Sequence, residues 1–333
     1  MTRHFFARPR ALLLTMIGGC ALLLCGCSRP APVVPVRIAL PIQLASGSAY
    51  VGQQLGSFQQ HGVDIALQPF QLGKQALEAV VRGNADLALV ADTPFMFAAL
   101  RGEPIATVAT VFGSRRALAV LGWRNSGIIG VNDLDGKTVG TVAGINAQYF
   151  LDALLVFHGI ERSRVKVVFL RPDQLANALR TRQVDAVTVW HPELGRLKTE
   201  LGDAVVALYG DGVFVNRFLL VGRTDYLDAH GDVVARTLAG LADATDAVHE
   251  QPERARAIVG KAIGIAPDLI AEAFDPADYY LALDQSLLLA LDDQTRWAMK
   301  QALVAPQRLP NYLTLLRQQP LRAARPNAVK VIQ

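Results

Sequence analysis

The stretch from Gly83 to Val90 reads Gly-Asn-Ala-Asp-Leu-Ala-Leu-Val, and it returns from Arg182 to Val189 as Arg-Gln-Val-Asp-Ala-Val-Thr-Val. In both places a helical pattern precedes a polar turn with an aspartate, and an apolar run of strand length follows. No constant period of about 20–50 residues runs through the chain, which argues against a solenoid. The sequence therefore predicts two lobes of similar build.

Strands alternate with helices around both stretches. The first series has strands at 36–40, 63–67, 86–91 and 105–112, and helices at 49–60, 72–82 and 94–100. The second has strands at 117–123, 137–142, 165–170 and 184–190, and helices at 146–158 and 174–181. Beyond them we expect strands at 203–208 and 214–221, helices at 233–249, 252–262, 268–274 and 285–304, and irregular coil from residue 306. This alternation predicts an α/β fold with mostly parallel sheets flanked by helices.

The N-terminus has the pattern of an export signal. Basic residues precede an uncharged run at 11–26, which is shorter than the roughly 20 apolar residues of a membrane-spanning helix. Leu24-Cys25-Gly26-Cys27 resembles a bacterial lipoprotein signal, in which Cys27 becomes the lipidated first residue. Cys20 fits the pattern less well, and a plain secretory signal or an uncleaved anchor is the alternative. We expect a signal peptide at 1–26 and a proline-rich tether at 27–35.

Composition excludes several classes of site. Hydrophobic residues make up 51% and charged residues 19%, which is typical of a packed globular protein. The net charge of +4 comes largely from the signal, so no nucleic-acid partner is expected. All three cysteines lie at positions 20, 25 and 27, which excludes a disulfide, a thiolate-bound zinc or a cysteine nucleophile from residues 28–333. No histidine pair has metal-binding helical spacing, and we expect neither metal nor cofactor.

Four stretches, in their order along the chain, resemble the sulfonate/nitrate/taurine group of solute-binding proteins, which serve ATP-driven importers and are related to a pyrimidine-precursor-binding group. They are Tyr50–Phe58 with His61–Ile65, Gly83–Leu87, Asp133–Gly140 and Val184–Pro192. The resemblance covers residues 36–225 well and the helical remainder loosely. It implies a type II periplasmic-binding-protein fold, in which two α/β lobes joined by two crossover segments hold the ligand in the cleft between them.

On that fold, the crossovers are expected near 113–116 and 190–192. Lobe I would comprise 36–113 and 191–333, and lobe II would comprise 114–190. Ligands of parallel sheets sit beyond the carboxyl ends of the strands, where loops lead into helices. The loops expected there are 46–50, 71–74, 92–94 and 144–147.

Candidate ligand-binding residues follow from these loops and crossovers. The loop with Gly144, Asn146 and Ala147 opens a helix and offers backbone N–H groups to an anion, although Asn146 also suits a simple cap. Further candidates are Ser46, Gly47 and Ser48 as donors, Tyr50 and Trp190 as aromatic covers, and Gly73, Asp92, Thr93, Ser114 and His191. The alternatives are helix capping for Asp92 and Thr93, helix packing for Tyr50 and a hinge role for His191, where the family more usually has glutamate. Lys74 is either an anion partner or a solvated helix end.

The resemblance implies a lipid-anchored, monomeric protein on the periplasmic side of the envelope, which hands a small organic anion such as a sulfonate to an ABC permease of the inner membrane. The alternative ligand is a flat heterocycle, such as a thiamine pyrimidine precursor or a flavin. A pyrimidine-synthesising enzyme exists among the relatives, but the cysteine-rich motif of that enzyme is missing from residues 28–333. A sensory binding lobe is a third class. We expect no enzymatic activity.

Overall fold

The computed structural model describes residues 33–332, which lie in one compact unit. The predicted signal peptide, Cys20 and Cys27, and most of the predicted tether lie outside the described residues. Within residues 33–332, no helix is both long enough and apolar enough to cross a bilayer.

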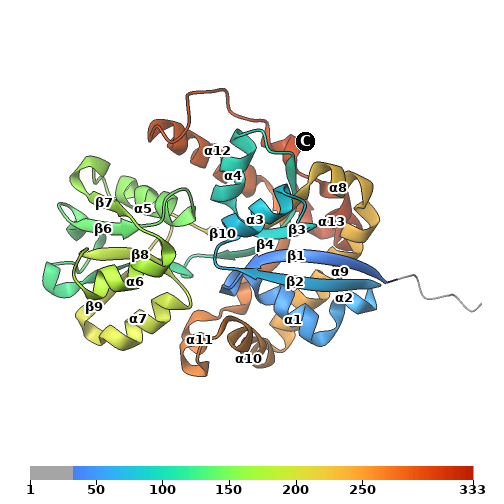
Figure 1. Cartoon of the computed structure of the whole chain (residues 1–333), viewed down its shortest axis with the longest axis horizontal. Coiled ribbons are helices and arrows are strands. Elements are labelled where there is room, and N and C mark those ends of the chain that lie inside the picture. Colours follow the sequence, from blue (N-terminus) through green and yellow to red (C-terminus); the bar gives the residue numbers. More distant parts are fainter. Residues whose placement is uncertain (1–32, 333) are drawn as a thin grey trace, which may run out of the picture. The chain divides into compact units, whose positions relative to one another are not determined.

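The first sheet has seven strands in the order β12-β11-β4-β10-β3-β1-β2. Figure 1 shows β1 and β2 side by side in it. Strand β1 pairs in parallel with β2 and β3, whereas β10 runs antiparallel between β3 and β4. Its strands are β1 (Val34–Pro41), β2 (Val63–Phe70), β3 (Leu87–Ala91), β4 (Ile105–Ser114), β10 (Asn216–Arg223), β11 (Tyr279–Asp284) and β12 (Val329–Lys330).

The second sheet has five strands in the order β7-β6-β8-β5-β9. Strand β6 pairs in parallel with β7 and β8, and β5 runs antiparallel between β8 and β9. The predicted parallel strands are therefore present as β2-β1-β3 and β7-β6-β8, and other strands add antiparallel pairs to each sheet. The strands are β5 (Leu118–Trp123), β6 (Thr138–Thr141), β7 (Lys166–Phe169), β8 (Ala186–Trp190) and β9 (Val205–Tyr209).

Helices flank both sheets, and each sheet has its own large hydrophobic core. The α-helices are α1 (Gly47–Leu55), α2 (Ser57–Gln60), α3 (Gly73–Val81), α4 (Asp92–Leu100), α5 (Asn146–Phe157), α6 (Pro172–Arg180), α7 (Glu193–Leu201), α8 (Thr224–Ala229), α9 (Gly231–Glu250), α10 (Pro252–Ile263), α11 (Pro267–Ala273), α12 (Gln285–Lys300) and α13 (Gln318–Ala324). Short 3-10 helices lie at Leu44–Ser46, Arg124–Ser126, Val131–Leu134, Arg162–Arg164, Gly202–Ala204, Pro276–Asp278, Tyr312–Leu315 and Pro326–Ala328.

The repeated aspartate has the same role in both sheets. Asp86 accepts a hydrogen bond from the backbone N–H of Arg37, within β1, at 2.8 Å. Asp185 accepts one from the backbone N–H of Thr138 at 2.9 Å, at the start of β6. Each carboxylate thus joins the strand that follows it to the neighbouring parallel strand. The sequence repeat reflects this shared strand-to-strand connection.

The chain passes between the sheets at residues 115–117 and 210–215. Ser114 and Asn216 pair at the ends of β4 and β10, so these two crossovers lie side by side. The sequence placed the second crossover near 190–192. Instead, α7 and β9 follow, and β9 pairs with β5 over Val205–Tyr209, so the second sheet continues to Tyr209.

The C-terminal region differs from the sequence-based expectation. The sequence did not predict β11, and it predicted irregular coil where α13 and β12 occur. Leu321 of α13 is fully buried, and the backbone N–H of Arg317 donates to Thr107 of β4. Pro320 lies in the first turn of α13 and Pro326 begins a 3-10 helix, where a proline needs no backbone N–H, so short elements form here and complete the first core.

Candidate functional site

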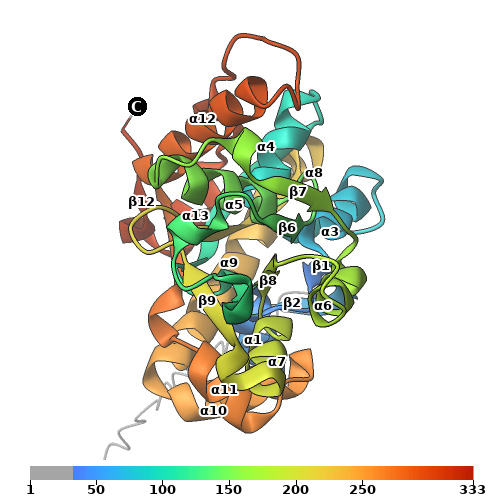
Figure 2. The ribbon, with the colours of Figure 1, turned by 90° about the vertical axis from the view of Figure 1, so that its left-hand side faces the viewer.

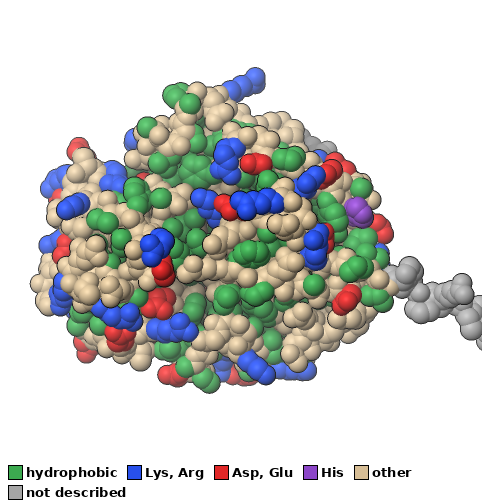
Figure 3. All heavy atoms as spheres, viewed as in Figure 1, with side chains coloured by type: hydrophobic (Ala, Val, Ile, Leu, Met, Phe, Trp, Pro, Cys, Tyr) green, Lys and Arg blue, Asp and Glu red, His purple; other side chains and the backbone are tan. Residues whose placement is uncertain are grey.

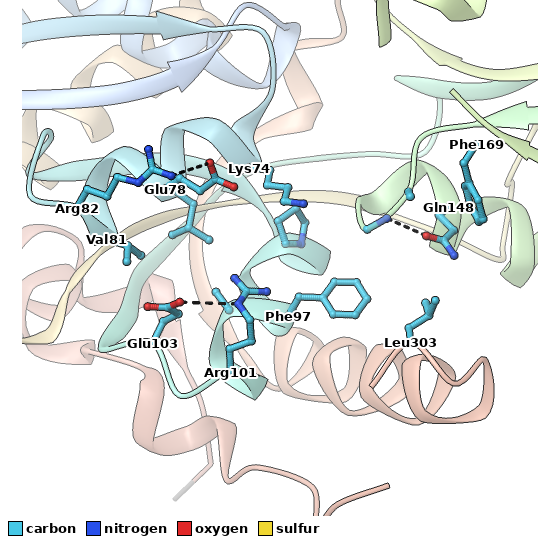
Figure 4. A pocket seen from close by; sticks show the side chains of 15 residues that line it. Lys74, Glu78, Val81, Arg82, Phe97, Arg101, Glu103, Gln148, Phe169 and Leu303 are labelled. Atoms are coloured by element: carbon cyan, nitrogen blue, oxygen red, sulfur yellow. Dashed lines mark hydrogen bonds and ion pairs between the residues drawn. The ribbon is translucent and has the colours of Figure 1, made fainter. Parts of the chain in front are cut away.

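A cleft of about 550 Å³ lies between the two sheets (Figure 4). Helices α3 and α4 form one side of it, through residues such as Lys74 and Phe97. Gly144 and Gln148 at the start of α5 form the other side, together with Phe169 at the end of β7. Leu303, just after α12, also lines the cleft. In Figure 3, basic and acidic side chains gather over α3 and α4 beside an apolar recess.

Two small spaces lie beside this cleft, each of about 10 Å³. Gly73, Asn146 and Trp190 line one of them, and Trp190 and His191 line the other. Lys74 and Pro94 line both the first space and the large cleft, which makes the two neighbours. The spaces together form an inner chamber, and each part has room for about one water molecule at most. The residues that meet there come from both sheets.

The start of α5 reaches across the cleft. The backbone N–H of Gly144 donates to Gln148 Oε1 at 2.8 Å, and Asn146 Nδ2 donates to Asn216 Oδ1 at 2.6 Å. Gly144 has a φ of 69°, which favours glycine, and Lys74 Nζ lies 3.9 Å from the place where a Cβ on Gly144 would be. Ala147 is fully buried. A helix N-terminus and an ammonium group thus lie together, which suits an anion.

Asp92 and Thr93 begin α4 and are fully buried. Neither side chain has a hydrogen-bond partner among residues 33–332. Burial raises the pKa of Asp92 to about 6, against the opposing effect of Arg217. Neither residue lines the cleft or the inner chamber.

His191 lies in the inner chamber as a neutral side chain. Burial lowers its pKa to about 4, and Nδ1 has no hydrogen-bond partner within the described part of the chain. Its backbone N–H donates to Ala117 O at 3.3 Å, next to β5. The unpaired Nδ1 is buried beside Gly195 of α7, 3.3 Å from the place where a Cβ on Gly195 would be.

The remaining predicted residues make contacts away from the cleft. Ser46 Oγ donates to Pro41 O at 2.6 Å, and Ser48 Oγ accepts a hydrogen bond from Thr245 at 3.3 Å. Gly47 packs against the Tyr279 ring. Tyr50 lines a separate surface hollow between α1 and α10.

Ser114 ends β4 and caps the first crossover. Its Oγ accepts hydrogen bonds from the backbone N–H groups of Arg116 and Ala117, each at 3.2 Å. Like Ser46 and Tyr50, it does not line the cleft or the inner chamber.

Sequence reasoning missed several residues that line the cleft. Phe97, Gln148, Phe169 and Leu303 carried no signal, because isolated apolar or amide side chains occur throughout such a chain. For Lys74 the sequence leaves two alternatives, an anion partner or a solvated helix end. Among the described residues, no group of three or more His, Cys, Asp or Glu could hold a metal ion.

Residues 45–255 match the family model described as NMT1/THI5 like. The chain belongs to the NMT1/THI5-like family. This match spans the strands and helices that form both sides of the cleft.

Relatives of this NMT1/THI5-like protein include candidate binding proteins. A candidate binding protein of Brucella abortus (strain 2308) is 23% identical over 234 residues, which are 68% of this chain and 71% of the relative. A candidate aliphatic sulfonates-binding protein of Escherichia coli (strain K12) is 28% identical over 62% of this chain and 64% of the relative.

Solved structures share the fold of this NMT1/THI5-like protein. The crystal structure of the periplasmic aliphatic sulphonate binding protein SsuA from Escherichia coli matches with a TM-score of 0.74 and 21% identity, over 85% of this chain and 97% of that one. The predicted periplasmic-binding-protein fold is therefore confirmed.

Further contacts in this NMT1/THI5-like protein hold the two sheets together on either side of the cleft. Trp297 Nε1 of α12 donates to Asp152 Oδ2 of α5 at 2.9 Å. On the other side, α7 lies beside α11 (Figure 2), where Lys198 forms an ion pair with Glu272. Helices that flank the two sheets are therefore in contact on either side of a narrow inner chamber.

Proposed function

We propose that this protein is a lipid-anchored, extracytoplasmic solute-binding protein that captures a small organic anion and delivers it to an ABC importer. The observation that carries the proposal is the cleft between the sheets, where Lys74 and the start of α5 meet. The relatives named above are binding proteins, and the proposal requires no catalytic step.

The proposed lobes follow the two sheets. Lobe I comprises residues 33–114 and 216–332, and lobe II comprises residues 118–209, with a hinge at the paired crossovers. A ligand that contacts α3 on lobe I and α5 on lobe II stabilises the closed arrangement, because only that arrangement offers both contacts. The inner chamber would then widen as the lobes open.

Charge in the cleft favours an anion. Lys74 has no carboxylate within 4.0 Å among residues 33–332, whereas Arg82 lies 3.9 Å from Glu78 and Arg101 lies 3.8 Å from Glu103 (Figure 4). The first-turn N–H groups of α5 carry a partial positive charge. A sulfonate or carboxylate between them would gain charge-assisted hydrogen bonds from both lobes.

The proposed location of the protein is inferred from its N-terminal sequence. The signal pattern at 1–26 and the lipoprotein-like sequence Leu24-Cys25-Gly26-Cys27 support a tether to a membrane on the periplasmic side, through an acylated Cys27. SsuA of Escherichia coli is described as periplasmic, which agrees with that location. Such a tether would keep a captured solute close to a permease.

A flat heterocycle is the second candidate ligand. Trp190 and Phe218 line the inner chamber, and Phe97 and Phe169 line the cleft, so aromatic surfaces are available for stacking. Tyr50, which the sequence offered as a second stacking residue, lies at the hollow between α1 and α10 instead.

A thermal-shift panel on the full-length protein tests the proposed function. The panel contains organic sulfonates, carboxylates, nitrate, pyrimidines and flavins. A ligand at 100 times its Kd stabilises the folded state by about 2.7 kcal/mol and raises the melting temperature. We expect sulfonates or carboxylates to do this. If no member of the panel shifts the melting temperature, the proposed function is wrong, and a shift with flavins or pyrimidines alone supports the second candidate.

A further inference from the structure

The cleft is larger than a simple anion requires. Its volume of about 550 Å³ lies within the range of roughly 300–1,000 Å³ that is typical of sites for drug-sized ligands. Lys74 and Gly144 lie near its inner end, because Lys74 also lines the inner chamber. A nitrate or methanesulfonate ion at Lys74 would leave most of this volume filled with water.

Large apolar side chains from three elements line the cleft beyond Lys74. Phe169 at the end of β7 is 52% exposed, and Leu303 after α12 is 39% exposed. Phe97 projects from α4 toward the side of the cleft that carries Gln148 and Phe169 (Figure 4). Single exposed apolar residues are ordinary on protein surfaces. These three come from opposite sides of the cleft and line one cavity, so they form an apolar wall.

The position of the Phe97 ring is fixed by packing. Its centroid lies 6.0 Å from that of Trp297 in an edge-to-face arrangement, and Trp297 is held in turn by its hydrogen bond to Asp152. Phe97 therefore presents a preformed surface, which lowers the entropy cost of binding an apolar group against it.

We propose that the ligand is an organic acid with an apolar body of at least butyl or phenyl size. Its acid group lies at Lys74 and the start of α5, and its body lies against the apolar wall of Phe97, Phe169 and Leu303. This inference rests on the proposed function and narrows its ligand class. It excludes inorganic anions and the smallest sulfonates as the main ligand, because they would leave the wall in contact with water.

The test is a tail series with a constant head group. The dissociation constants of methane-, butane-, octane- and benzenesulfonate are measured with the full-length protein by calorimetry. Each methylene that becomes fully buried tightens binding by up to about fourfold. We expect butane- and benzenesulfonate to bind at least tenfold more tightly than methanesulfonate. Equal affinity across the series, or tightest binding of methanesulfonate, overturns the inference and leaves the proposed function standing.

Variants of the apolar wall test whether the apolar body of the ligand binds there. Phe169→Ala and Leu303→Ser should reduce the tail dependence, so that benzenesulfonate loses at least fivefold in affinity and methanesulfonate changes little. Phe157→Ala and Leu289→Ser are matched controls, since Phe157 is 64% and Leu289 is 58% exposed and neither lines the cleft. A tail dependence that survives in both wall variants contradicts the assignment of the wall. If no acid binds the unsubstituted protein, the proposed function itself fails.

Discussion

Asp92 is a fully buried carboxyl group without a hydrogen-bond partner among the described residues. An unpaired buried charge is costly, and the group responds by holding its proton more tightly. Burial raises the pKa of Asp92 to about 6, above its ordinary value near 3.8. The contribution of the Asp92 carboxyl group to the free energy of unfolding is therefore fully present below about pH 4 and is lost as the pH rises through about 6.

Replacing Asp92 by asparagine should remove this pH dependence. Relative to the unsubstituted protein, Asp92→Asn should gain about 2–3 kcal/mol of unfolding free energy between pH 4 and pH 7, because asparagine carries no charge to bury. Urea denaturation of the full chain at several pH values measures the difference. The exposed Asp64→Asn is the control. If the difference falls as the pH rises, the Asp92 carboxylate is paired in the folded protein.

Lys74 is exposed, so a substitution there should affect binding more than folding. Loss of its charge-assisted contact should weaken an organic sulfonate roughly tenfold or more in Lys74→Met. Lys261→Met is the matched control, since Lys261 is an exposed helical lysine at the hollow beside Tyr50. Equal losses of sulfonate affinity in the two variants would point to a general effect of net charge.

At the scale of elements, α3 packs closely against β3 and thereby positions Lys74. A Cβ on Gly73 would lie 3.1 Å from Val90 Cα and 3.2 Å from Leu89 O. These are backbone atoms, so neither can move aside without shifting the strand. The absence of a side chain at Gly73 therefore allows the approach of the helix.

Gly73→Ala should displace α3 and destabilise the protein by about 1–3 kcal/mol, as overpacking does. Gly231→Ala at the start of α9 is the control, since nothing lies within 4 Å of its added Cβ, and it should be neutral or slightly stabilising. Urea midpoints of both variants give the comparison. A Gly73→Ala protein as stable as the Gly231→Ala protein would show that α3 has room to adjust.

The strand and helix patterns predicted the elements that carry Gly73, Asn146 and Trp190, and all three line the inner chamber. These patterns did not predict β11, whose Tyr279 contacts the first of the loops expected to bind ligand, residues 46–50. Tyr279 of β11 packs against Gly47 and donates a hydrogen bond to Leu44 O at 2.8 Å. A contact between residues more than 200 positions apart is not encoded in local periodicity. For the same reason the cleft positions of Phe169 and Leu303 could not be read from the sequence.

At the scale of the whole molecule, contacts between α5 and α12 hold the proposed lobes together. Trp297 donates to Asp152, and its ring lies 5.1 Å from that of Tyr149. Asp152 also pairs with Arg162 at 2.8 Å within its own lobe. Loss of the indole N–H would remove a connection between the lobes and leave each lobe intact.

Trp297→Phe should therefore favour the open arrangement in the absence of ligand, with a larger radius of gyration by small-angle X-ray scattering. Trp123→Phe is the matched control, since Trp123 Nε1 donates to Leu179 O at 2.8 Å within proposed lobe II. It should lose stability without a change in compaction. Identical scattering from the two variants would show that the Trp297 contact does not control opening.

Calorimetric titration of benzenesulfonate into the full-length protein and its Lys74→Met variant tests whether the cleft between the proposed lobes binds an organic anion. We expect saturable one-to-one binding to the unsubstituted protein and at least tenfold weaker binding to the variant. Equal affinity in both proteins, or no saturable binding of this or any other organic sulfonate or carboxylate, would contradict this expectation.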